Sequence, residues 1–144
     1  MTRILSTCLA IVMAASSAWG AEADAILRPA GDAEIADFRW HKRPVVVFAD
    51  SDEDPRFIEQ VEYLREGLEL LNERDVVVLT DTDPDSRLPL RMKLRPRGFM
   101  LAIVAKDGTV MLRKPLPWTV REITRSIDKM PDRQREIEER RGQG

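Results

Sequence analysis

The stretch that decides the fold runs over residues 43–81, RPVVVFADSDEDPRFIEQVEYLREGLELLNERDVVVLTD. It begins with an apolar, β-branched run at 44–49 and ends with a second one at 75–80, each typical of a strand buried on both faces. Between them, Asp54 and Pro55 form a good helix start, with Asp as N-cap and Pro in the first turn. Apolar residues then recur at spacings of three and four up to residue 72, which predicts one amphipathic helix. Two strands joined by a helix in this way should lie parallel.

The elements that follow can be read from the remaining patterns. A short helix is expected around Leu90, and a third strand at 99–105 leads into the Asp-Gly turn of a hairpin, whose return strand covers 110–113. Thr119 and Glu122 form a capping box that starts a last helix, and Pro131 should break or kink it.

The resulting order, β-α-β-(α)-β-β-α, predicts an α/β, thioredoxin-like fold with a mixed four-stranded sheet flanked by helices. The domain should cover residues 38–131. An extended lead-in at 21–37 precedes it, and a polar tail at 132–144, helical or disordered, follows it. Trp40 and Trp118 flank the strand block and are expected to close the core.

Residues 1–20 have the form of a secretory signal peptide. Arg3 precedes an uncharged apolar run at 4–18, and Ala18-Trp19-Gly20 offers the small residues of a cleavage site, with Ala21-Glu22-Ala23 as a second candidate. An uncleaved anchor is the alternative, but the run is shorter than the roughly 20 residues that a spanning helix needs. We therefore expect an exported protein, periplasmic or secreted, with no membrane span after cleavage.

Composition narrows the function further. The single cysteine, Cys8, lies inside the predicted signal peptide, so the mature chain would have neither a disulfide nor a thiol nucleophile. The 144 residues carry 23 basic and 25 acidic side chains, a net charge of -2. Because nucleic-acid binding usually requires a basic excess, a protein or a cell-envelope component is the favoured partner.

Several phrases together resemble domain-of-unknown-function family 4174, the prokaryotic branch of the DUDES proteins. The resemblance covers roughly residues 35–137 and implies a peroxiredoxin-like, thioredoxin-fold domain, for which it implies no established activity. In this family the closing phrase usually reads Met-Pro-Met-Arg-Gln, so Asp132 is a departure. The phrases that carry the resemblance are Arg39-Trp40, residues 43–49, Gln60, residues 73–78, Lys106-Asp107-Gly108, Arg113 and residues 127–136.

The redox landmarks of this fold are missing from the sequence. A thioredoxin or peroxiredoxin places its reactive cysteine in the loop after the first of the two parallel strands, where the helix N-terminus lowers the thiol pKa. This chain has Asp50-Ser51-Asp52-Glu53-Asp54 there instead. The position of the usual cis-proline falls near Met100, and Pro96 comes too early. We expect neither a thiol-disulfide oxidoreductase nor a cysteine peroxidase, and no catalytic residue is assigned.

Two charged segments are candidate sites. Ligands of open α/β sheets bind beyond the carboxyl ends of parallel strands, where both acidic loops should lie. Their carboxylates could hold a divalent cation, with calcium the best match, although no cofactor is required. Ordinary capping, turn formation and pairing with arginines is the alternative. The acidic candidates are Asp50, Asp52, Glu53, Asp54, Asp81, Asp83 and Asp85, of which Asp50, Asp52, Asp81 and Asp83 are the metal candidates; the basic candidates, for an anionic ligand, are Arg87, Arg91, Arg95 and Arg97.

Two functions remain after these exclusions. The first is an exported thioredoxin-like domain that acts as a non-redox binding or interaction module. The second is an enzyme with non-thiol chemistry, or a calcium site, at the acidic loops. An enzyme needs a pocket in which unpaired carboxylates converge, whereas a binding module would show them paired or in solvent.

Overall fold

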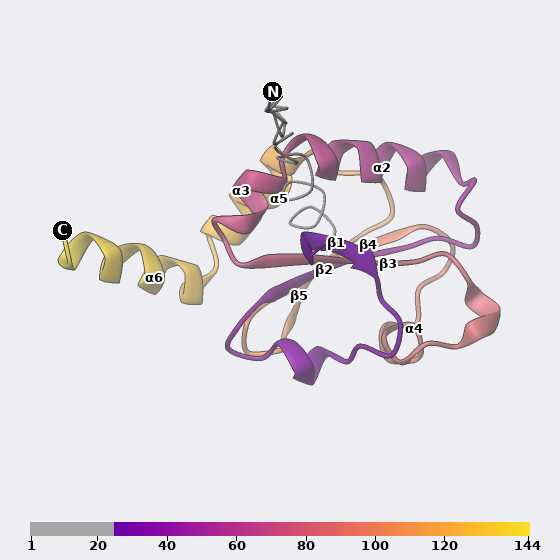
Figure 1. Cartoon of the computed structure of the whole chain (residues 1–144), viewed down its shortest axis with the longest axis horizontal. Helices are drawn as coiled ribbons and strands as arrows, with labels where there is room; N and C mark the ends of the chain where they lie inside the picture. Colours follow the sequence, from indigo (N-terminus) through magenta and orange to yellow (C-terminus); the bar gives the residue numbers. More distant parts are fainter. Residues whose placement is uncertain (1–24) are drawn as a thin grey trace, which may run out of the picture.

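The computed structural model describes residues 25–144 and shows a mixed sheet of five strands with helices on both faces (Figure 1). The predicted signal peptide, its cleavage sites and Cys8 lie outside the described residues. The strand order is β1-β3-β2-β4-β5; β1, β3 and β2 are parallel, and β4 and β5 are antiparallel to their neighbours. The strands are β1 (Leu27–Pro29), β2 (Arg43–Phe48), β3 (Val76–Asp81), β4 (Met100–Val104) and β5 (Val110–Lys114).

The sheet has one strand more than the four predicted. Leu27–Pro29, within the predicted lead-in, pairs with Val78–Thr80 of β3 and forms the edge strand β1. Three residues of mixed character that include a proline carry no alternating pattern, so the sequence gives little sign of this strand.

Helices cover the two faces of the sheet unequally. On one face lie α2 (Pro55–Glu66), α3 (Leu68–Asn72) and α5 (Val120–Asp128), which bury Leu64, Leu71 and Ile123 against β2, β3 and β4. The other face is covered by α4 (Pro89–Leu94) and by the 3₁₀ helix η1 (Ile35–Phe38). Every residue of β2 is buried, as the uninterrupted apolar run predicts. Two further elements, the 3₁₀ helix η2 (Pro84–Ser86) and α6 (Pro131–Gly142), complete the order, and α6 projects from the body (Figure 1).

The single helix predicted up to residue 72 is interrupted at Gly67. A Cβ atom at this position would lie 2.6 Å from Cγ1 of Val120, so the junction between α2 and α3 packs its backbone directly on α5. The start of α5 is also fixed from α2. The buried side chain of Gln60 donates to the Trp118 carbonyl (2.8 Å) and accepts from the Trp118 amide (2.8 Å). The predicted capping box of Thr119 and Glu122 is present.

Candidate functional site

The loop after β2, where this fold usually holds its thiol, has its own local structure. Asp54 caps α2 by accepting a hydrogen bond from the Arg56 amide (2.9 Å) and also pairs with the Arg56 guanidinium (3.3 Å). These hydrogen bonds from Arg56 lower the pKa of Asp54. The Ser51 hydroxyl accepts from the Glu53 amide (3.1 Å), a bond that shapes the turn. Asp54 and Ser51 therefore stabilise the loop, and Asp50, Asp52 and Glu53 are exposed to solvent.

The second acidic loop is built around a buried ion pair. Asp81 is 3% exposed, and its carboxylate lies 2.9 Å from Nε of Arg91. The same guanidinium donates to the carbonyls of Ala49 (2.9 Å) and Asp81 (3.1 Å), so Arg91 ties together the ends of β2 and β3. Asp83 caps η2, and its hydrogen bond from Ser86 lowers its pKa. Asp85 is exposed.

The contacts of the two acidic loops bear on the predicted calcium site. The two loops do leave the same end of the sheet, as predicted. Within residues 25–144, however, no three His, Cys, Asp or Glu side chains gather as they would to hold a metal ion. The calcium site stays a prediction, and the contacts of Asp54, Asp81 and Asp83 match the alternative of capping and pairing.

The four predicted anion contacts do not form one site. Arg91 is buried in its pair with Asp81. Arg87 is exposed and ends η2 with a left-handed backbone (φ 45°). Arg95 ends α4 in the same conformation (φ 50°), and Arg95 and Arg97 line a shallow hollow together with residues of β4 and β5.

The opposite end of the sheet holds an ionic cluster that the sequence analysis did not anticipate. It is centred on Arg43, the first residue of β2, whose side chain is fully buried. Arg43 donates to the Arg74 carbonyl (2.8 Å), to Asp132 (3.0 Å) and to Glu136 (2.9 Å). We call the ionic cluster the ion-paired set Arg43, Arg74, Asp75, Lys106, Asp128, Asp132, Arg133 and Glu136.

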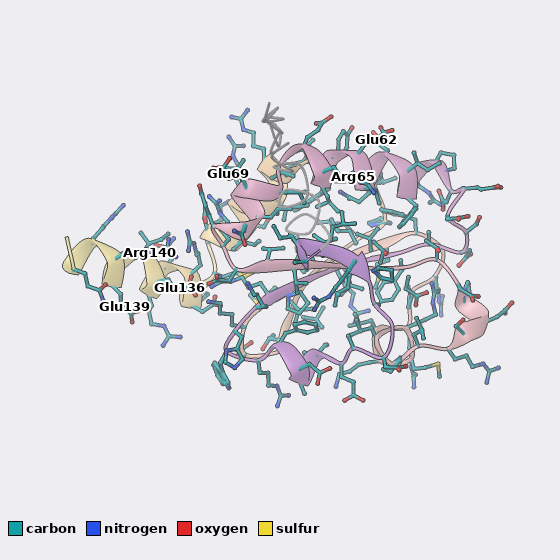
Figure 2. The ribbon with its side chains drawn as sticks, viewed as in Figure 1. Glu62, Arg65, Glu69, Glu136, Glu139 and Arg140 are labelled. Atoms are coloured by element: carbon teal, nitrogen blue, oxygen red, sulfur yellow. The ribbon has the colours of Figure 1, made fainter. Side chains whose placement is uncertain are left out.

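Glu136 is the most connected acid of the ionic cluster. It lies 2.7 Å from Nζ of Lys106 and 3.1 Å from Nη1 of Arg133, in addition to its bond with Arg43. Burial raises the pKa of Glu136, but the hydrogen bonds from these three cations outweigh it and bring the pKa down to about 2. Arg74 pairs with Asp128 (2.9 Å) and lowers its pKa. The cluster therefore fastens the first half of α6 to the sheet, and Figure 2 shows Glu136 near the body and Glu139 and Arg140 farther out on α6.

A groove of about 490 Å³ lies beside the ionic cluster, between α6 and the β4–β5 hairpin. Trp40 stands at this groove with 70% of its surface exposed, so the prediction that it closes the core is wrong; Trp118 packs against the core as predicted. Met111, Met130 and Pro131 add apolar surface, and Arg135 and Glu139 add charge.

The backbone of Trp40 is held in a left-handed conformation (φ 67°), which is unfavourable for a bulky side chain. Three hydrogen bonds fix it there. The Trp40 amide donates to the Lys106 carbonyl (2.8 Å), and the amides of His41 and Lys42 donate to the Phe38 carbonyl. The strain is thus maintained by the surrounding structure, a pattern found at binding and catalytic sites.

The strand order, the helices on both faces and the parallel β2-α2-α3-β3 unit define a thioredoxin-like domain. Its described residues hold no cysteine and no cis peptide bond. Solved structures show the same fold. Prx1a from Plasmodium yoelii matches with a TM-score of 0.55 and 16% identity, and the match covers 73% of this chain and 82% of that chain. The exposed lipoprotein thioredoxin Etrx1 from Streptococcus pneumoniae matches with a TM-score of 0.53 and 15% identity, and the match covers 67% of this chain and 90% of that chain. Chloroplastic thioredoxin z is similar too (TM-score 0.50, 23% identity, 67% and 85%).

The chain belongs to the family described as Domain of unknown function (DUF4174), which matches residues 34–136. No curated protein matches the sequence. The family range includes the eight residues of the ionic cluster, together with Trp40. Four of the phrases that carry the resemblance, those around Arg43, Arg74, Lys106 and Glu136, therefore meet in space at the end of the sheet opposite the loop after β2, whereas Gln60 and Arg113 lie elsewhere. Arg43 begins β2 and Asp75 immediately precedes β3, and these charged residues at strand starts were a signal from which sequence reasoning could have found the ionic cluster.

Proposed function

We propose that this chain is an exported, non-redox binding module whose partner polypeptide docks in the groove between Trp40, the β4–β5 hairpin and α6. The exposure of Trp40 beside this groove is the observation that carries the proposal. Tryptophan gives a large contact area at low entropic cost and is enriched among the residues that dominate interface energies.

The surroundings of the groove support a binding role. The ionic cluster fixes one wall, α6, and the turn hydrogen bonds fix Trp40, so little ordering entropy would be lost on binding. Met111 is 43% exposed and Met130 forms apolar floor, a combination that suits an apolar side chain of a partner. The mixed charges at the rim would accept a polar polypeptide around that anchor.

The proposal that the module is non-redox rests on the residues of the loop after β2, where a thioredoxin would carry its cysteine. The loop after β2 carries Asp54 as a helix cap, and Cys8 is the only cysteine of the chain. Carboxylates do not replace a thiolate in disulfide exchange or peroxide reduction. Export is supported by the signal-peptide pattern of residues 1–20.

Affinity capture tests the proposal. The chain from residue 21 onward is used as bait in a cell-envelope extract, and bound proteins are quantified for the wild type, Trp40→Ala and Met92→Ala. Met92 is 55% exposed on α4, away from the groove, and so controls for loss of an exposed apolar side chain. A partner is a protein that Met92→Ala retains and Trp40→Ala loses by about tenfold. If every captured protein responds equally to both variants, the groove is not the docking site.

A further inference from the structure

A second hollow, of about 270 Å³, lies at the other end of the sheet, where β4 begins and β5 ends. Met100 in its wall pairs with Phe48, the last residue of β2, so the hollow is at the edge where ligands of open α/β sheets bind. Its lining includes four cations and an aromatic ring: Arg95, Arg97, Arg113, Lys114 and Phe99. We call this the basic hollow.

The charge of the basic hollow is not balanced by neighbouring acids. No acidic residue lines it. Within residues 25–144, its four cations take part in none of the ion pairs, whereas Arg43, Arg74 and Arg91 are all paired. The chain as a whole carries a net charge of -2, so four unpaired cations around one small hollow are a local concentration. Such a concentration favours an anionic ligand.

Contacts with uncharged groups hold two of the four cations, Arg113 and Lys114, in place. Arg113 donates to the Leu94 carbonyl at the end of α4, which ties its guanidinium to that helix. Lys114 has its ammonium 4.8 Å from the centre of the Trp118 ring. Phe99 is 2% exposed and forms the floor of the hollow. The Arg56 guanidinium lies over its ring, with 5.7 Å between Cζ and the ring centre. Because Arg113 and Lys114 are already held in place, they lose less conformational entropy when an anion binds.

We propose that the basic hollow binds a compact oxyanion carrying two or more negative charges, namely a phosphate or diphosphate group. Guanidinium groups match phosphate oxygens with two parallel hydrogen bonds, and lysine adds a point charge. The volume is slightly below the roughly 300–1,000 Å³ of sites for larger organic ligands, so one or two phosphate groups fit its size. The site is independent of the Trp40 groove, because the two lie at opposite ends of the sheet.

Calorimetric titration with sodium pyrophosphate, at constant ionic strength, tests the site on the chain from residue 21 onward. One saturable site is expected, and it should weaken by about tenfold or more in the double variant Arg97→Gln/Lys114→Gln. The matched control, Arg65→Gln/Lys93→Gln, removes one Arg and one Lys outside the hollow and should change the affinity less than about twofold; Figure 2 shows Arg65 on α2. Thermal melting of each variant checks that it is folded.

A second arm identifies the source of the phosphate group. Vesicles containing phosphatidic acid present the same chemistry as a lipid headgroup. Binding to pyrophosphate and not to vesicles assigns a free anion, and binding to vesicles alone assigns the headgroup. Binding to both shows that the hollow accepts the phosphate group from either source. Each result supports the proposal only if Arg97→Gln/Lys114→Gln weakens the binding. The proposal is overturned if neither probe binds saturably, or if the control variant loses as much affinity as the hollow variant.

Discussion

Arg43 and Glu136 are 93 positions apart in the chain, and Nη2 of the arginine lies 2.9 Å from Oε1 of the glutamate. The arginine begins β2, at the centre of the sheet, and the glutamate lies on α6. Because the Arg43 side chain is fully buried, this contact both neutralises a buried charge and fastens α6 to the domain. The wall of the Trp40 groove depends on it.

Glu136→Gln should destabilise the protein by about 2 kcal/mol, because it leaves Arg43 and Lys106 with less compensation in a buried setting. Urea denaturation monitored by circular dichroism measures the effect. Glu139→Gln, on the projecting part of α6, serves as the comparison and should stay within about 0.5 kcal/mol of the wild type. Equal stabilities for the two variants would show that the ionic cluster does not fasten α6.

Acid should destabilise the folded chain through Glu136. Its pKa is about 2 in the folded protein, below the ordinary value of 4.5. A lowered folded-state pKa means that the stabilisation is fully present above pH 4.5 and is lost as pH falls toward 2. The loss could reach roughly 3 kcal/mol. Denaturation of the wild type and of Glu136→Gln between pH 7 and 3 checks this: the wild type should lose more stability, and parallel losses would contradict the assignment.

Gly67→Ala should destabilise the protein by about 1–3 kcal/mol, because the new Cβ would meet Val120 at 2.6 Å. Val120→Ala alone should cost about 1–2 kcal/mol as a cavity. In the double variant it should relieve part of the clash, because the two Cγ contacts at 2.6 and 2.7 Å disappear and only the contact with the Cβ of residue 120, at 2.8 Å, is left. A double-mutant cycle in urea therefore predicts a combined loss smaller than the sum. Strict additivity would mean that α2 and α5 can move apart at this point without cost.

Asp81→Asn should cost about 3 kcal/mol, since it leaves the Arg91 guanidinium buried without its carboxylate. Asp85→Asn, at an exposed position in the same loop, should cost less than about 0.5 kcal/mol. Thermal melting of both variants makes the comparison. A similar loss in the two would place Asp81 among the solvated acids and remove its role in joining β2 and β3.

The fold was predictable because its central unit depends on local patterns. The buried runs at 44–49 and 75–80 and the Asp54-Pro55 helix start act within a few residues of themselves, and each is where the sequence places it. Edge strand β1 was missed because a strand of three residues can pair at the edge of a sheet without any alternation of apolar and polar side chains in its sequence. The break at Gly67 was missed because its cause, Val120, lies 53 positions away.

The candidate site was harder to predict for the same physical reason. The acidic loops attract notice because their charges are contiguous in the sequence, yet Asp81 is used in a buried ion pair. The members of the ionic cluster come from four separate segments, and their pairing is set by the sheet register and by the position of α6. The exposure of Trp40 could not be read from the neighbouring sequence either, because one of the three hydrogen bonds that hold its left-handed turn is accepted by the Lys106 carbonyl, 66 positions away.

Photo-crosslinking at two positions tests most directly whether the groove, rather than the loop after β2, is the docking site. Met111, in the groove, and Asp52, in the loop, are each replaced by a photoreactive phenylalanine derivative in the full chain, and the cells are irradiated. The proposed function predicts a discrete protein adduct from position 111 that disappears with Trp40→Ala, and none from position 52. An adduct from position 52 alone, or an adduct from position 111 that persists in Trp40→Ala, would contradict it.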